Sequence, residues 1–124
     1  MNSTRPLILA IDQGTTNTKA ILVDAAGQVQ ARASTPLSVT YPRPSWVEQD
    51  ATAIWESVVQ CAAAVLASAS LTPVALGISN QRESVVLWDR VTGEPLAPCV
   101  IWHGQRGNAL VESLKQPRVA DEVH

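Results

Sequence analysis

The chain has 124 residues, of which 46% are hydrophobic and 16% charged, and its formal net charge is -2. This length fits one domain with its own core, and the low charge argues against a nucleic acid or anionic membrane partner held by electrostatics. No run of 18 apolar residues predicts a membrane span, and the start of the chain does not resemble a signal peptide. Cys61 and Cys99 lie in apolar runs without metal-ligand spacing, so we expect free buried thiols and a cytoplasmic location.

The first half of the chain predicts a three-stranded antiparallel meander followed by a helix. An apolar run at 7–11 predicts a strand covered on both faces, a second run at 20–23 predicts its neighbour, and alternation over 28–34 predicts a third strand with one wet face. Prolines interrupt 36–49. Asp50 is then a candidate N-cap for a helix that is expected to end near Ser70.

The second half predicts shorter elements. A buried strand is expected at 74–78, further strands at 85–88 and 99–102, and a weaker helix at 108–115, whereas 116–124 show no pattern and are expected to be frayed. This order predicts an α/β protein with a mixed sheet and helices packed on it. The glycine patterns of the Rossmann fold and the Walker-A loop are both absent from the sequence.

A polar run lies between the first two predicted strands, Asp12-Gln13-Gly14-Thr15-Thr16-Asn17-Thr18-Lys19. A glycine followed by two threonines offers several backbone N–H groups and hydroxyls to one point, which favours an anion such as phosphate. Asp12 could hold Mg²⁺, which usually takes one or two carboxylates together with phosphate oxygens, and Lys19 could add positive charge. A polar hairpin with an Asx-turn at Asp12 is the alternative that these residues leave open.

Four segments in order resemble the FGGY carbohydrate kinases, and among them the glycerol kinases most closely. They are AIDQGTTNTKAILVD (10–24), YPRPSWVEQDATAIWESV (41–58), LGISNQRESVVLWDRVTGEPL (76–96) and VIWHGQR (100–106). The first is shared by the wider actin and hexokinase superfamily, whereas the Asn-Gln-Arg-Glu match in the third is more specific. The resemblance implies an RNase H-like fold of the actin and hexokinase type. It also implies ATP-dependent phosphorylation of a polyol or sugar hydroxyl, with glycerol to glycerol 3-phosphate as the first candidate.

The same resemblance assigns site residues by position. Mg²⁺ would be held by Asp12. The ATP phosphates would lie at the following residues of the polar run: Gly14, Thr15, Thr16, Asn17 and Lys19. The substrate hydroxyls would be bound by Gln81, Arg82 and Glu83, with Trp102 lining the pocket.

The chemistry of these residues agrees with that assignment. A polyol hydroxyl both donates and accepts, and Arg82 supplies a rigid fork of donors while Glu83 supplies acceptors. The alternatives are a solvated surface pair for Arg82 and Glu83 and core packing for Trp102. Three other tryptophans are expected to be packing residues, namely Trp46, Trp55 and Trp88. Glu48 is expected to belong to a loop.

Two features limit what the resemblance implies about the substrate and the extent of the protein. Ser84 replaces the threonine usual in glycerol kinases, and WHGQR departs from their Gln-Cys-Arg-Arg-like run, so another small polyol or sugar stays open. The family's general base and adenine site lie far downstream. Residues 1–124 would therefore be a truncated N-terminal part of the substrate-binding domain, ordered over about 6–115, without the C-terminal nucleotide domain.

Such a chain is expected to be inactive alone, because phosphoryl transfer needs both walls of the cleft. It is also expected to form homo-oligomers through the face left uncovered. An alternative from another functional class is a non-catalytic, actin-like module for nucleotide binding or assembly. Such a module would have no reason to carry Arg82, Glu83 and Trp102.

Overall fold

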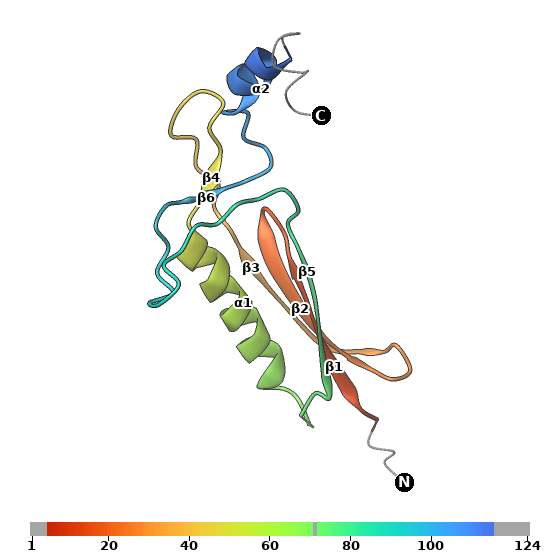
Figure 1. Cartoon of the computed structure of the whole chain (residues 1–124). Coiled ribbons are helices and arrows are strands. Elements are labelled where there is room, and N and C mark those ends of the chain that lie inside the picture. Colours follow the sequence, from red (N-terminus) through yellow and green to blue (C-terminus); the bar gives the residue numbers. More distant parts are fainter. Residues whose placement is uncertain (1–4, 71, 116–124) are drawn as a thin grey trace.

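The computed structural model describes residues 5–70 and 72–115 of the chain. Within these ranges the chain forms six strands and two helices, which Figure 1 shows coloured along the sequence. Their bounds are β1 Leu7–Gln13, β2 Asn17–Asp24, β3 Val29–Pro36, β4 Glu48–Gln49, α1 Ala51–Leu66, β5 Ala75–Asn80, β6 Cys99–Val100 and α2 Asn108–Leu114. The segment 116–124, which was expected to be frayed, lies outside the described residues.

The main sheet has four strands in the order β3-β2-β1-β5. The first three form an antiparallel meander, and β5 then pairs with β1 in parallel. A parallel pair needs a long crossover connection, and here that connection contains α1. The predicted meander and the mixed sheet are therefore both confirmed.

One face of the sheet carries α1 and the main core (Figure 1). Alternate residues of β1 and β2 point toward the helix, and the helix presents residues at a spacing of about one turn. The buried members of this cluster are Leu9, Ile11, Ala20, Leu22, Cys61 and Val65. Two buried polar side chains, those of Thr18 and Ser57, lie beside this cluster. Their hydroxyls are 2.6 Å apart, so each has a hydrogen-bond partner.

The predicted N-cap of α1 is confirmed. The Asp50 carboxylate accepts hydrogen bonds from the backbone N–H groups of Thr52 at 2.8 Å and Ala53 at 3.3 Å. The helix ends at Leu66, four residues before the expected end. The chain tightens there, because the N–H groups of Ser68 and Ala69 bond back only three residues, to Val65 and Leu66.

Replacing Asp50 with alanine is expected to lower the free energy of unfolding by about 1 kcal/mol, because two N–H groups at the start of α1 lose their acceptor. Urea unfolding followed by circular dichroism measures this change. Asp50→Asn is the matched control, since its side-chain carbonyl can still cap the helix. Equal losses in both variants would contradict the capping role.

The prediction that β5 is buried is wrong for the described residues, in which all six of its positions are exposed. Leu76 and Ile78 share the α1 face of the sheet by register, yet they are 58% and 62% exposed. The physical reason is coverage, because α1 packs mainly on β2 and β3 and leaves the edge strand β5 open. Ile8 of β1 is likewise exposed on the opposite face, so the expectation of two covered faces for that strand is also wrong here.

A second, two-stranded sheet pairs β4 with β6. Glu48, expected in a loop, is part of this sheet, and the small core beside it consists of Val47, Cys99 and Ile101. The strand expected at 85–88 forms only single bridges at Val85 and Trp88, so that prediction is wrong. The strand expected at 99–102 is shortened to two residues.

The helix expected at 108–115 is present as α2, but it does not lie on the main sheet. It lies beyond the small sheet (Figure 1), and none of its residues is buried. The preceding segment carries α2 past the end of the main sheet, so the packing prediction holds for α1 alone. In the part of the chain that the structure describes, neither helix combines the length and apolar character needed to cross a bilayer.

Both cysteines are free and buried, as expected. Cys61 lies in the main core, where its thiol is 3.3 Å from the carbonyl oxygen of Thr18. Cys99 lies in the small core, and burial raises the pKa of its thiol. A raised pKa keeps the thiol protonated and unreactive.

Candidate functional site

The polar run forms the ends of two strands and a short turn. Asp12 and Gln13 end β1, residues 17–19 begin β2, and residues 14–16 make the connection. The Gly14 N–H donates to the carbonyl oxygen of Asn17 at 3.0 Å and closes the turn. A Cβ atom at Gly14 would lie 2.9 Å from the same oxygen. Real Cβ atoms essentially never approach backbone so closely, so this turn requires glycine.

Asp12 and Lys19 face each other across the hairpin. They are cross-strand partners, and Asp12 is also beside Ser79 of β5 in register. Asp12 and Lys19 are exposed, whereas their neighbours Gln13 and Thr18 point to the opposite, α1-bearing face. Among the described residues the Asp12 side chain forms no hydrogen bond, whereas Asp24 and Asp89 each accept from backbone N–H groups. The Asx-turn alternative at Asp12 is therefore wrong.

The Asp12 carboxylate fits a magnesium ion that takes most of its other oxygen ligands from a bound phosphate. The described residues contain no group of three potential metal-binding side chains. Mg²⁺ does not need such a cage, because one or two carboxylates and phosphate oxygens commonly suffice. A free carboxylate two residues before the turn at Gly14 provides that kind of ligand.

The loop at 81–84 lies beside this turn. Since β5 runs parallel to β1, the carboxyl ends of the two strands meet at one edge, with Gln13 opposite Asn80. The amide nitrogen of Gln81 lies 3.3 Å from the Gly14 carbonyl oxygen, so two segments 67 residues apart are joined directly. Arg82 and Glu83 follow in the exposed part of the loop. The structure thus brings the predicted phosphate turn and the predicted hydroxyl-binding loop together.

Glu83 has an unusual backbone conformation, with φ of 60°. A non-glycine residue in this left-handed region is strained, and such strain often occurs at functional sites. The loop is held on its inner side, where the Ser84 hydroxyl lies 3.3 Å from the side-chain oxygen of Gln81. The folded loop at the end of β5 therefore imposes the strained conformation on Glu83.

Glu83→Gly is expected to raise the free energy of unfolding by up to about 1 kcal/mol, because glycine adopts positive φ without steric cost. The carboxylate that the sequence predicts to bind hydroxyls is lost at the same time, so on that prediction we expect the variant of the intact protein to bind a polyol or sugar more weakly. Thermal unfolding and acceptor titration measure the two effects. Glu83→Gln keeps the strain and removes the charge, so its stability should match the parent; a stabilisation of equal size there would contradict the account.

Trp102 belongs to the same edge rather than to the core. Its indole N–H donates to the Thr15 hydroxyl at 2.9 Å, and the side chain is 51% exposed. Its ring centroid is 3.6 Å from that of His103. The core-packing alternative for Trp102 is therefore wrong, and a third distant segment reaches the hairpin.

The expectation that the other tryptophans are packing residues holds only in part. Trp46 is half-buried against Arg106, whose guanidinium carbon lies 4.0 Å from the ring centroid and whose Nη2 is 2.8 Å from the Glu48 carboxylate. Trp55 and Trp88 are 65% and 57% exposed and line a shared hollow, so the prediction is wrong for them. They lie outside the cores because α1 directs Trp55 away from the sheet and Trp88 belongs to an irregular segment.

A buried glutamine completes the site, and sequence reasoning missed it. Gln49 is 1% exposed, and its amide nitrogen donates to the carbonyl oxygen of Thr15 at 2.6 Å and to that of Ser38 at 3.3 Å. Its side-chain oxygen accepts from the Gln81 amide at 2.9 Å. A signal was present in the sequence, because Gln49 follows the apolar Val47 by two residues and shares its face in a strand.

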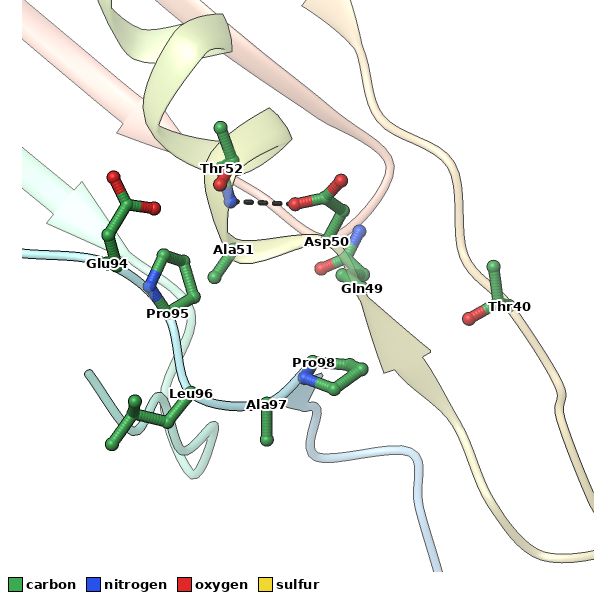
Figure 2. Close-up of a pocket in the computed structure, with 10 residues that line it drawn as sticks. All are labelled: Thr40, Gln49, Asp50, Ala51, Thr52, Glu94, Pro95, Leu96, Ala97 and Pro98. Carbon is green, nitrogen blue, oxygen red and sulfur yellow. Dashed lines mark hydrogen bonds between the residues drawn. The ribbon is translucent and has the colours of Figure 1, made fainter. Parts of the chain in front are cut away.

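A separate hollow of about 480 Å³ lies at the start of α1 (Figure 2). Its lining consists of Thr40, Gln49, Asp50, Ala51, Thr52, Glu94, Pro95, Leu96, Ala97 and Pro98. None of the residues that the sequence predicts for the site lines it. Figure 2 shows the Asp50 carboxylate engaged with the Thr52 N–H, so this carboxylate of the hollow is already used as a cap.

The chain is similar to known proteins of one family. Residues 7–124 match the family model described as the FGGY family of carbohydrate kinases, N-terminal domain. The chain is 50% identical over 111 residues to an apulose kinase of Pectobacterium atrosepticum, and 46% identical over 112 residues to a glycerol kinase of Geobacter sp.. These alignments cover 89% and 88% of the chain but 22% and 23% of the two relatives. The chain therefore spans less than a quarter of their length.

The solved structures give the same result for the fold. The crystal structure of Plasmodium falciparum glycerol kinase with ADP superposes with a TM-score of 0.82 at 30% sequence identity. The match covers 90% of this chain and 23% of that one. The mixed sheet is thus of the actin and hexokinase type, as the sequence predicts.

Proposed function

Because the chain belongs to the FGGY family of carbohydrate kinases, we propose that the intact protein transfers a phosphoryl group from ATP to a hydroxyl of a small polyol or sugar. Glycerol is the first candidate substrate. The observation that carries the proposal is the hydrogen bond from Gln81 to the Gly14 carbonyl, which joins the phosphate turn to the hydroxyl-binding loop. A kinase needs its two substrates side by side in this way, since phosphoryl transfer depends on positioning and electrostatic stabilisation.

On this proposal the hairpin binds the nucleotide phosphates. The backbone and hydroxyls of residues 14–17 contact the phosphate oxygens, Lys19 adds positive charge, and Asp12 holds Mg²⁺ directly or through water. The bound metal ion would neutralise negative charge on the phosphates. Trp102, whose indole N–H donates to the Thr15 hydroxyl, would line the acceptor pocket beside the hairpin.

The loop at 81–83 binds the acceptor. Arg82 donates to substrate hydroxyls, and Glu83 accepts from them. Both side chains are exposed, so they are free to meet a ligand. This pair favours a kinase over the alternative of a non-catalytic actin-like module, which would have no use for hydroxyl recognition. Residues 1–124 alone are expected to be inactive, because they supply one wall of the cleft.

A second substrate has specific support. The 50% identity to an apulose kinase exceeds the 46% identity to a glycerol kinase, so a small sugar is a candidate beside glycerol. The experiment is a panel of polyols and sugars offered to the intact gene product with Mg²⁺-ATP, with ADP release measured for each. We expect one small polyol or sugar to give the highest kcat/KM. Absence of turnover across the panel by the folded protein would overturn the proposal.

A further inference from the structure

Three side-chain amides hold the carbonyl groups of the hairpin turn on one side. The Gly14 carbonyl accepts from Gln13 at 2.7 Å and from Gln81 at 3.3 Å, and the Thr15 carbonyl accepts from Gln49 at 2.6 Å. Gln13 and Gln49 are 8% and 1% exposed, and all three bonds are partly buried. The turn is therefore anchored by its carbonyls to the interior of the domain.

The orientation of the carbonyls fixes the orientation of the N–H groups. In a trans peptide the C=O and N–H bonds point in opposite directions, and the structure contains no cis peptide bond among the described residues. If the carbonyls of Gly14 and Thr15 point inward, the N–H groups of Thr15 and Thr16 point outward. Within the described part of the chain neither N–H group forms a hydrogen bond. Two donors side by side are thus presented to an anion.

Among the three glutamines, Gln49 links the hairpin turn to Gln81. Its nitrogen holds the Thr15 carbonyl, while its oxygen accepts from the Gln81 amide and directs that amide toward Gly14. Both ends of one carboxamide are used, and the side chain is buried, so no water is needed to complete it. The same bond fixes Gln81, the residue that precedes Arg82.

We propose that Gln49 is a positioning residue for nucleotide phosphates, which orients the peptides at 14–16 so that the N–H groups of Thr15 and Thr16 meet the phosphate oxygens. This inference rests on the proposed function. Gln49 itself touches neither nucleotide nor acceptor. Its effect is therefore expected on binding of the phosphates, and not on binding of the nucleoside part of ATP.

Gln49→Met in the intact gene product tests the inference, because methionine has similar length and no donor. We expect the Kd of ATP, measured by calorimetry, to rise about tenfold, which corresponds to the loss of one preoriented contact. The Kd of adenosine, measured by displacement of ATP, should stay within about twofold. Adenosine has no phosphate groups and so does not make the contact that the variant weakens. Gln60→Met is the matched control, because Gln60 is an exposed residue of α1.

Gln81→Met is the second variant, at a less buried position, and it covers the case in which Gln49→Met does not fold. An unchanged Kd of ATP in the folded variants would overturn the inference, as would parallel loss of ATP and adenosine. The parallel loss would indicate a structural role only. If the parent protein binds ATP but phosphorylates no acceptor, the proposed function fails while the ratio of the two affinities still decides the role of Gln49.

Discussion

Gly14→Ala in the intact protein is expected to lower kcat/KM for ATP by about 100-fold or more, since a misplacement near 1 Å in a catalytic site can cost that much. The physical reason is the 2.9 Å approach of the new Cβ atom to the Asn17 carbonyl oxygen. That oxygen belongs to the backbone of β2, so relief requires the turn to move. The shift would carry the N–H groups of Thr15 and Thr16 away from the phosphates. Steady-state kinetics with varied ATP measures the effect.

Gly107→Ala is the matched control for this prediction. No atom lies within 4 Å of a Cβ placed at Gly107, and its φ of -84° is open to alanine. The control should therefore retain the parent kinetics. If Gly14→Ala also retained them, the requirement for glycine in the turn would be refuted.

Arg82→Ala is expected to lower kcat/KM for the hydroxyl substrate by about 100-fold or more, because each lost hydrogen bond to a charged donor costs about 1.5–3 kcal/mol. A site built to bond hydroxyls leaves them unpaired when the donor is removed. The Kd of ATP should change little, since Arg82 lies on the loop that follows β5 and not on the hairpin. Acceptor kinetics and ATP calorimetry on the same variant separate the two effects.

Arg90→Ala is the control for charge alone. Arg90 is also an exposed arginine, in the turn at 89–93. It should leave both measurements unchanged. An equal loss of kcat/KM for the acceptor in the two variants would assign the effect to overall charge. A loss of ATP binding in Arg82→Ala would contradict the assignment of ATP to the hairpin and of the acceptor to the loop.

The local features of this fold were predictable from the sequence. The hairpin around Gly14, the Asp50 cap and the inward face of α1 depend on neighbours within a few positions or on one helical period. The site residues of the hairpin and of the 81–83 loop followed from a resemblance, and the parallel pairing of β1 with β5 explains why the two segments meet. Periodicity alone gives no such pairing.

Other features depend on distant parts of the chain and were not predictable. The apolar pattern of β5 indicates a strand that can be buried, but it does not say which segment covers Leu76 and Ile78. The alternation of Gln49 with Val47 indicates the face on which its side chain lies, but not its hydrogen-bond partners, which lie 34 and 32 positions away along the chain. The positive φ of Glu83 likewise follows from the loop as folded, since its residue type favours no such conformation.

Phosphorus NMR of the intact gene product with Mg²⁺-ATP and a small polyol or sugar tests the proposed phosphoryl transfer most directly. We expect the γ-phosphate signal to fall and a phosphate monoester of the acceptor to appear in equal amount. We also expect Arg82→Ala to suppress the monoester while ATP binding persists. Release of inorganic phosphate without a monoester, or no change with any acceptor of the panel, would contradict a kinase that joins these two subsites.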